Sequence, residues 1–323
     1  MSFSICIKHP DSLNYQIIDK KSSNWIIFKD NINDWINHKL KQENWTSYIL
    51  YNDEIDSTVS TNSTNQSKGI LLWNENSISW LIHSIPKWPL KLFDNIPKCE
   101  YKYVHTLIFM TFHIDNLSNI IDQIKLMQSN IYETSNYNYI PRKRAPALDK
   151  CVKIIELGKN MYHIAKHNKI SKNLFKDIII ETYGNKDNKE YVYLCKSRTD
   201  YTTKNDKNIV DDIVDDIENI DIIYLNKVIP KTFNSKISKF ALHQPILNNE
   251  IVLNIIDETI AVDNIIDKSK WAISSSIENP WVCISDLNNR LIDNTKSGGG
   301  IVIVDRDIWR LMMNLYYCSS DIL

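Results

Sequence analysis

The chain has 323 residues, 43% of them hydrophobic, a formal net charge of −1 and a pI near 6.7. This length and apolar content are enough for one large domain or for two lobes that share a substantial core. The near-neutral charge provides no global basic field of the kind that indicates a nucleic-acid-binding protein, and no acidic excess that argues against one.

The sequence shows neither of the two segment types that direct a chain into or across a membrane. No run of about 18 apolar residues occurs, so we expect no membrane-spanning helix and no membrane partner. The first ten residues lack a basic start followed by a long apolar core, which predicts no secretory signal and an intracellular location. Frequent Ile, Asn, Lys and Asp indicate an AT-rich genome, such as that of a large DNA virus or a protist. For a virus, the expected place is the host nucleus or cytoplasm, or the virion.

The first 67 residues contain strand-like runs and one polar loop. Residues 25–28 and 45–51 combine β-branched and aromatic side chains between Asn and Asp residues, which predicts strands. Residues 56–67 are almost all Ser, Thr, Asn and Gln, which predicts an exposed loop.

The next segment predicts a hairpin, a buried strand and a helix. The runs Ile70–Trp73 and Trp80–Ile85 predict a hairpin around the turn Asn74–Asn76. Residues 103–112 form an apolar run that predicts a buried strand. Residues 116–131 carry apolar side chains at helical spacing, which predicts a helix.

Residues 132–150 hold three tyrosines and the basic run Arg142–Arg144, which is flanked by prolines. Basic residues close to aromatic ones can bind nucleic acid, but a solvated loop between lobes is favoured here. We place the lobe boundary in this segment, with a first lobe at residues 1–140 and a second at residues 141–323.

The last third of the chain predicts mainly helical segments. Residues 204–222 alternate aspartate pairs with isoleucines, which favours an acidic amphipathic helix over a metal cluster because no histidine accompanies them. The run Ile308–Tyr317 predicts a closing helix.

One pattern occurs twice, about 200 residues apart. A Ser-Lys pair opens a short apolar run, and about a dozen residues later a Trp opens a second apolar run that ends in polar groups. The two copies are Gln66–Gly69 with Trp80–Ser84, and Asp267–Trp271 with Pro280–Asn288. Internal similarity of this kind predicts two equivalent lobes in one chain rather than a solenoid.

These segments resemble the deoxyribonuclease II family, a branch of the phospholipase D superfamily. The matching segments are Tyr51–Asp53, Lys68–Leu72, Trp80–Pro86, Ser269–Trp271, Pro280–Cys283 and Gly298–Gly300. Residues 233–243 also resemble a family segment that precedes a helix. The resemblance covers most of the chain and is weakest in its middle third. It implies an α/β fold of two similar lobes, each a mixed β-sheet flanked by helices.

The resemblance also implies an active site made of two His-x-Lys motifs, one from each lobe. In the family, one histidine attacks phosphorus, the other protonates the leaving oxygen, and the lysines hold phosphate oxygens. The matching motifs here are Gln66-Ser67-Lys68 and Lys268-Ser269-Lys270, so both lysines remain and both histidines are absent. Asn74 stands near the position where the family has an acidic residue.

Neither replacement residue can do the chemistry of imidazole, whose pKa of about 6.5 suits both a nucleophile and an acid. The amide nitrogen of Gln66 is not basic. Lys268 has a reference pKa of about 10.4, so it is cationic near neutrality. We therefore expect no intact catalytic residue. The positions of the degenerate active site are Gln66, Lys68, Asn74, His83, Lys268, Lys270, Asp286 and Asn288.

Two histidines leave an alternative open. His83 matches a family histidine after the Trp80 strand, and His105 lies in the next predicted strand. A structural role is favoured for His83, but a compensating His83–His105 pair could restore an active site.

The remaining charged and amide residues of the pattern also allow two interpretations. Lys68 and Lys270 could form a phosphate-binding pocket. They could equally form ion pairs with Asp286 or Glu75. Asn288 completes the polar end of the second copy of the pattern.

Six cysteines occur, and no pair has the spacing of metal ligands, so we expect neither a metal nor a cofactor. Cys283 matches a family cysteine whose implied disulfide partner stands at Ile303 here. That disulfide is therefore lost, which suits a reducing compartment, although lattice or intermolecular disulfides stay open.

These observations predict an inactive deoxyribonuclease II-like protein that serves as a structural, self-assembling protein, for example in a viral particle or its surrounding matrix. The alternatives are a phosphate- or nucleic-acid-binding module and a metal-independent endonuclease with a rearranged site. We expect homotypic contacts as the main partner interaction, with residues 56–67 and 132–150 as candidate contact segments.

Overall fold

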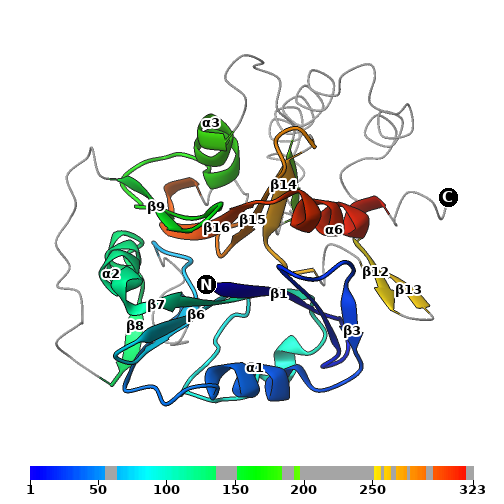
Figure 1. Ribbon diagram of the computed structural model, residues 1–323, viewed down its shortest axis with the longest axis horizontal. Coiled ribbons are helices and arrows are strands. Elements are labelled where there is room, and N and C mark those ends of the chain that lie inside the picture. The colour runs from blue at the N-terminus through cyan, green and yellow to red at the C-terminus, as the bar shows by residue number, and fades with distance from the viewer. Residues whose placement is uncertain are drawn as a thin grey trace, which may run out of the picture.

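The computed structural model describes residues 1–54, 64–135, 151–183, 193–196, 251–255, 258–262, 267–274, 277–288 and 294–317. Its strands form two large sheets that face each other, as Figure 1 shows. All described strands before residue 135 belong to the first sheet, and those of the second sheet follow residue 151. The prediction of a two-lobed α/β fold is confirmed. The predicted boundary at residues 140 and 141 falls outside the described residues and stays a prediction.

The first sheet has eight strands in the order β3-β2-β1-β7-β6-β5-β4-β8. Their bounds are β1 (Ser2–Lys8), β2 (Tyr15–Asp19), β3 (Ile26–Phe28), β4 (Ser47–Tyr51), β5 (Gly69–Trp73), β6 (Ser77–His83), β7 (His105–His113) and β8 (Ile131–Thr134). The helical segments of this lobe are α1 (Ile32–Leu40), η1 (Lys98–Glu100), η2 (Ile114–Asn116) and α2 (Leu117–Leu126).

The second sheet has six strands in the order β11-β14-β15-β16-β10-β9. Their bounds are β9 (Val152–Gly158), β10 (Met161–Lys166), β11 (Tyr193–Lys196), β14 (Trp271–Ser274), β15 (Trp281–Ser285) and β16 (Gly298–Val304). A separate hairpin joins β12 (Ile251–Ile255) to β13 (Glu258–Val262), and the helical segments are η5 (Leu174–Ile179), α3 (Ile180–Tyr183) and α6 (Arg306–Tyr317).

The described strands pair antiparallel throughout both sheets, whereas the sequence favoured mixed sheets. The predicted hairpin at residues 70–85 accounts for part of this result, since a tight turn can join only antiparallel strands. The β5–β6 turn is closed by an Asn74 N–H bond to the Ser77 carbonyl at 3.0 Å.

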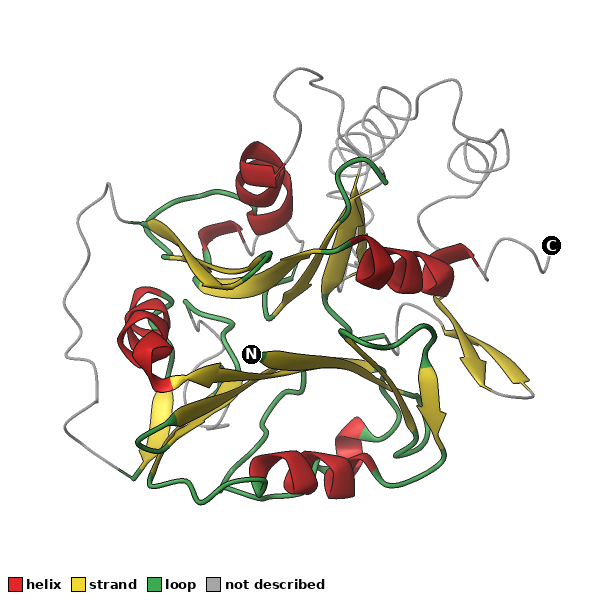
Figure 2. Ribbon diagram, in the orientation of Figure 1, coloured by secondary structure: helices red, strands yellow, loops and turns green. Residues whose placement is uncertain are grey.

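The apolar core fills the space between the sheets and covers their outer faces as well. One cluster joins side chains of both sheets, including Trp80, Ile108, Trp271 and Ile301. Other clusters pack α1 on the outside of the first sheet and the η5–α3 segment on the outside of the second (Figure 2). Because both faces of each sheet are covered, the central strands are apolar runs rather than alternating patterns.

Helix α1 shows how a local sequence pattern packs a helix on the outer face of the first sheet. Asn31 caps it by accepting a hydrogen bond from the Asn33 N–H at 3.0 Å. Ile32, Ile36 and Leu40 then follow at four-residue spacing and are all buried against the first sheet.

The predicted helix at residues 116–131 is shorter in the structure. Helix α2 ends at Leu126, and Gln128 adopts a positive φ of 53° that helical backbone does not allow. Residue 131 instead begins β8. The predicted C-terminal helix is confirmed as α6.

Several other predicted features lie outside the described residues. They are residues 56–63 of the loop at 56–67, residues 136–150 of the segment at 132–150, and the segments at 204–222 and 233–243. At the described end of that loop the prediction of exposure is wrong, because Asn65, Gln66 and Ser67 are buried. Within the described part of the chain, no helix is long and apolar enough to cross a membrane.

Candidate functional site

The two Ser-Lys motifs are held in the same local conformation. In the first lobe, Asn65 Oδ1 accepts a hydrogen bond from the Ser67 N–H at 3.1 Å. In the second lobe, Asp267 Oδ1 accepts one from the Ser269 N–H at 2.8 Å. A side chain that binds the backbone two residues later forms an Asx turn. Each turn fixes the motif lysine directly before a strand, β5 in the first lobe and β14 in the second.

Each motif is also hydrogen-bonded to the opposite lobe. The Gln66 N–H donates to the Ser297 carbonyl at 2.9 Å, and the Lys268 N–H donates to the Val104 carbonyl at 3.0 Å. Ser297 directly precedes β16 and Val104 directly precedes β7. The two motifs are therefore placed at the contact between the lobes by reciprocal bonds.

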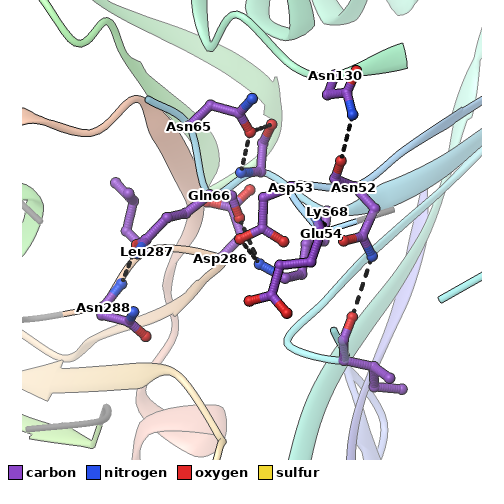
Figure 3. Close-up of polar contacts among 12 residues, drawn as sticks. Asn52, Asp53, Glu54, Asn65, Gln66, Lys68, Asn130, Asp286, Leu287 and Asn288 are labelled. Carbon is purple, nitrogen blue, oxygen red and sulfur yellow. Dashed lines mark hydrogen bonds and ion pairs between the residues drawn. The ribbon is translucent and has the colours of Figure 1, made fainter. Parts of the chain in front are cut away.

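Two lysines and two aspartates gather at this contact. Lys68 Nζ forms a buried ion pair with the Asp53 carboxylate, and it donates to the Gln66 carbonyl at 3.1 Å. Lys270 Nζ donates to the main-chain carbonyl of Asp286 at 2.7 Å. Figure 3 shows Lys68, Asp53 and Asp286 close together. The charges of the four side chains sum to zero when all are ionised. We call these four residues the charge cluster.

Burial changes the acidity of both carboxylates in the charge cluster. Burial raises the pKa of Asp286 to about 7, while the Gly299 N–H, which donates to it at 2.8 Å, and the two lysines act in the opposite direction. Burial also raises the pKa of Asp53, against the opposing effect of Lys68 and Lys270. The lysines therefore compensate the cost of burying these carboxylates only in part.

Gln66 acts as a hydrogen-bond acceptor between the lobes. Its buried side-chain carbonyl oxygen accepts a hydrogen bond from the Asn288 N–H at 2.9 Å (Figure 3). Asn288 follows β15 in the second lobe, so this hydrogen bond joins the two lobes. An amide has no basic nitrogen, and this geometry gives it a structural role.

Lys268 is held by a carboxylate and an aromatic ring. Its Nζ donates to both oxygens of Glu100, at 2.8 and 3.1 Å, and lies 3.5 Å from the centre of the Tyr103 ring. The side chain is 21% exposed, so this pair sits at the edge of the site. An ion pair with a carboxylate and a contact with a ring face together fix the position of the Lys268 side chain.

His105 belongs to a buried chain of polar groups. Its Nε2 lies 3.1 Å from Glu100 Oε2, and its Nδ1 lies 3.2 Å from Ser84 Oγ. Burial lowers the pKa of His105 to about 4, although Glu100 acts to raise it. His105 is therefore neutral near pH 7, with Glu100 accepting from Nε2–H and Ser84 donating to Nδ1.

His83 binds its own neighbouring backbone rather than His105. Its Nδ1 accepts from the Ile85 N–H at 3.2 Å, which places the ring proton on Nε2. Burial lowers the pKa of His83 well below its usual value, and the nearby Lys68 lowers it further. The ring packs edge-on against Trp88, with the ring centres 4.8 Å apart. The structure thus gives the two histidines separate partners.

Asn74 and Glu75 are not brought to the charge cluster. They lie in the β5–β6 turn, at the opposite end of β5 from Lys68. Asn74 Oδ1 accepts from the Ser77 N–H at 2.9 Å, and Asn74 Nδ2 donates to Glu43 at 3.0 Å. The ion pair considered between Lys68 and Glu75 is therefore wrong, because a whole strand separates the two side chains.

The sequence reasoning missed two carboxylates that the structure places at the site. Asp53 ends the segment after β4, and it meets Lys68 because β4 and β5 pair with Tyr51 opposite Gly69. Glu100 reaches Lys268 across the lobe contact. The segment at residues 51–53 contributed to the family resemblance, which was the one available signal for Asp53.

The structure also bears on the predictions about the cysteines and about metal ligands. Cys283 is buried in β15 and Ile303 lies in β16, where an isoleucine cannot form the disulfide implied by the family. Among the described residues, no group of three or more His, Cys, Asp or Glu side chains is arranged to hold a metal ion.

Comparison with known proteins gives a family match along nearly the whole chain. The family model described as deoxyribonuclease II matches residues 2–319. That range includes both motifs and every strand described above.

Individual relatives are similar at lower identity. The chain is 26% identical over 289 residues to deoxyribonuclease-2-beta of Mus musculus, an alignment that covers 84% of this chain and 71% of the mouse protein. It is 25% identical over 221 residues to cell death-related nuclease 6 of Caenorhabditis elegans, covering 57% of this chain and 58% of that protein. The human deoxyribonuclease-2-beta is 23% identical over 336 residues, with 95% and 83% covered.

Proposed function

The chain belongs to the deoxyribonuclease II family, and we propose that it is a non-catalytic member that serves as a structural, self-assembling protein. The observation that carries the proposal is the identity of the first residue of each motif and the contact that this residue makes. Gln66 and Lys268 stand where the family resemblance implies histidines, and each uses its polar group in a contact of its own.

Neither residue offers the lone pair that an attack on phosphorus requires. The nitrogen of the Gln66 amide is delocalised into its carbonyl, and the carbonyl oxygen already accepts from the Asn288 N–H. The amine of Lys268 would have to lose its proton while Glu100 and the Tyr103 ring hold it as a cation. Neither position therefore provides the nucleophile that would form the covalent phosphoenzyme implied by the family resemblance.

The charge cluster also disfavours the phosphate-binding alternative. A phosphate site needs cations whose charge is available to the ligand. Here Lys68 is paired with Asp53, and Lys270 lies near both buried aspartates. An entering phosphate would compete with two carboxylates that the fold already holds in place.

A rearranged nuclease is the second candidate, and one observation favours it. His105 is paired with Glu100, and a carboxylate that orients an imidazole is common in enzyme sites. However, His105 and His83 are both buried, and the hydrogen-bond partners of His105 already occupy both its nitrogens. If this candidate is correct, His105→Gln abolishes DNA cleavage by the wild-type chain.

The structural role is supported by the framework that persists around the altered motifs. Gly299 is an example: a Cβ at this position would lie 2.6 Å from the Ile164 carbonyl oxygen, so the close approach of β16 and β10 requires glycine. The near-zero net charge weakens self-repulsion between copies. We propose homotypic contacts as the use of this fold, with a viral particle or its matrix as the setting.

Two measurements on one purified sample test the proposal. The first is cleavage of plasmid DNA without metal from about pH 4.5 to about pH 7.5, which spans acid and neutral optima. The second is the molar mass by light scattering as protein concentration rises. We expect no cleavage and a mass that increases with concentration. A monomer at all concentrations would contradict the assembly proposal, and cleavage would contradict the non-catalytic one.

A further inference from the structure

The loop between β6 and η1 leaves two large apolar side chains in solvent. Leu90 is 55% exposed and Phe93 is 38% exposed. Single exposed apolar residues are normal on protein surfaces. These two, however, lie three residues apart on one loop, residues 84–97, which packs beside α1 on the outside of the first sheet.

This loop is fixed to the protein by its own polar groups. Trp88 is buried, and its Nε1–H donates to the Asp94 carbonyl at 2.9 Å. The Asp94 carboxylate accepts from the Lys91 N–H at 2.8 Å, and Asn52 Nδ2 donates to the Trp88 carbonyl at 2.6 Å. These hydrogen bonds therefore hold the loop in its conformation without a contribution from the Leu90 side chain.

The backbone at Phe93 is held in an unfavourable conformation with its ring outward. Phe93 has a φ of 69°, in the left-handed region that bulky residues rarely adopt. Lys87 has a φ of 53°. The Ile96 N–H, three residues after Phe93, donates to Asn33 Oδ1 on α1 at 2.8 Å. Local strain maintained by surrounding contacts is typical of functional segments.

The charges around the two apolar side chains are mainly positive. Lys87 and Lys91 are exposed on the same loop, where Asp94 is the one acidic residue, and Lys98 is exposed at the start of η1 directly after it. The Asp94 carboxylate is directed into the loop by its bond from the Lys91 N–H. From α1 the exposed Lys41 reaches the loop, with Nζ 5.1 Å from the centre of the Phe93 ring.

We propose that Lys41, Lys87, Leu90, Lys91 and Phe93 form a docking surface for an anionic membrane. Apolar side chains that enter the interface of a bilayer, surrounded by lysines that meet acidic headgroups, are the usual elements of peripheral membrane binding. The sequence predicted no membrane partner because it lacks a spanning segment. Docking on the surface of a bilayer needs no such segment.

Two other occupants fit this surface less well. Single-stranded nucleic acid binds by stacking bases on ring faces, but Lys41 lies over the Phe93 ring and Leu90 offers no ring. A second copy joined by a two-fold axis would place the same lysines against one another. An anionic lipid surface satisfies both the lysines and the aliphatic side chain.

Cosedimentation of the full chain with lipid vesicles tests the proposal. We expect binding to vesicles of phosphatidylcholine mixed with phosphatidylserine, weak binding to phosphatidylcholine alone, and a loss of binding as salt rises. Lys87→Gln with Lys91→Gln should reduce the partition coefficient roughly 25-fold, since each lysine near an acidic surface contributes about fivefold. Leu90→Asn with Phe93→Asn should reduce it at least about tenfold.

Matched control variants lie on another part of the same lobe. Ile26 is 50% exposed on β3, and Lys20 and Lys21 are exposed beside it. Ile26→Asn and the pair Lys20→Gln with Lys21→Gln should leave vesicle binding unchanged. The lysine variants and Ile26→Asn should keep the wild-type melting temperature. The variant Leu90→Asn with Phe93→Asn should melt no lower, because Asn adopts the positive φ of residue 93 more readily than Phe.

Three results would overturn the proposal. One is equal loss of vesicle binding in the control variants. Another is a loop variant that weakens binding to single-stranded DNA while vesicle binding stays the same. The third is a Leu90→Asn variant that lowers the molar mass in solution without affecting vesicles, which would assign the surface to a second copy.

Discussion

The two lobes repeat one hydrogen-bond pattern with different side chains. After β6 of the first lobe, Ser84 Oγ accepts from the Thr106 N–H at 3.1 Å. After β15 of the second lobe, Asp286 Oδ1 accepts from the Gly299 N–H at 2.8 Å. The strand registers place these residues at matching positions. The same backbone position therefore holds a neutral hydroxyl in one lobe and a buried carboxylate in the other.

A second matching pair concerns His83. Its Nδ1 accepts from the Ile85 N–H at 3.2 Å, and in the second lobe Ser285 Oγ accepts from the Leu287 N–H at 2.9 Å. A serine performs in one lobe the bond that the histidine performs in the other. This position needs an acceptor for the following backbone, not an imidazole, which supports a structural role for His83.

Buried lysines support the two lobes in the same way. Lys8, at the end of β1, donates to the carbonyls of Tyr101 at 2.6 Å and Tyr103 at 2.8 Å. Lys166, at the end of β10, donates to the carbonyl of Lys296 at 2.6 Å. In both lobes the carbonyls belong to the segment that leads into the strand β7 or β16. The comparison teaches that the framework around the motifs is common to both lobes, whereas the polar groups it presents differ.

The largest expected effect concerns the motif lysines. Lys68→Met leaves the buried Asp53 without its cation, and we expect the free energy of unfolding to fall by about 3–5 kcal/mol. Lys270→Met removes a bond to the Asp286 main-chain carbonyl and a positive charge that favours the ionised form of both buried aspartates, and it should cost about 1–3 kcal/mol. Urea unfolding at neutral pH measures both.

The double variant Lys68→Met with Asp53→Asn separates pairing from packing. The free energy of unfolding should fall by less than the sum of the two single losses. Asp53→Asn removes the carboxylate that Lys68→Met alone would leave without a cation. Additive costs would contradict the direct pairing of Lys68 with Asp53.

The next effect tests the common framework. Lys8→Met and Lys166→Met each leave buried carbonyls without a donor, so we expect each to lower the free energy of unfolding by about 2–4 kcal/mol. The two losses should be similar, since the residues occupy matching positions. Chemical denaturation of both variants provides the measurement, and tolerance of one change but not the other would break the proposed equivalence.

The third prediction concerns His163, which is replaced by the residue type found at the matching position of the first lobe. This buried residue on β10 pairs with Ile301, as Ile5 on β1 pairs with Ile108. Neither ring nitrogen of His163 has a hydrogen-bond partner among the described residues, and its ring packs on Trp80. We expect His163→Ile to stabilise the fold at about pH 4.5 by about 2–3 kcal/mol.

The pH dependence gives the sign of this effect. Burial lowers the pKa of His163 from 6.5 to about 3, so the unfolded chain binds a proton that the folded chain refuses. The wild type should lose stability as pH falls below about 6.5, while His163→Ile should lose less. Thermal melts across this range check the prediction, and parallel pH profiles for the two proteins would contradict it.

The smallest expected effect concerns the link made by Gln66. Gln66→Met keeps the volume of the side chain but removes the acceptor for the Asn288 N–H. Because Asn288 is only partly buried, water can take over that bond, and we expect a cost of about 1 kcal/mol. A loss above about 3 kcal/mol in urea unfolding would show that the Gln66 side chain contributes more than this one hydrogen bond.

Much of the lobe architecture follows from short-range sequence patterns. The two Trp-initiated runs and the turn at Asn74–Asn76 are local features, so the β5–β6 hairpin could be predicted. The repeated Ser-Lys pattern predicted two lobes for the same reason. Helix α1 was missed although Ile32, Ile36 and Leu40 have helical spacing, because the helix has only nine residues and lies between two strand-like runs.

The site itself depended on contacts that no local pattern contains. Asp53 reaches Lys68 through the register of β4 and β5, across a long connection. Glu100 meets Lys268 only after the lobes associate, 168 residues apart in the chain. Asn74 was placed at the site because it stands near the position of an acidic residue of the family, but strand β5 separates it from Lys68.

The central claim is that the framework persists while the nucleophile is missing, and a metal-free plasmid cleavage assay tests it most directly. The assay compares the wild type with Gln66→His combined with Lys268→His, from about pH 4.5 to about pH 7.5. We predict that the wild type leaves the plasmid intact at every pH. Cleavage gained by the double variant would show that Lys68 and Lys270 can still hold a phosphate despite their contacts with Asp53 and Asp286. Cleavage by the wild-type chain that His83→Ala or His105→Gln abolishes would contradict the account.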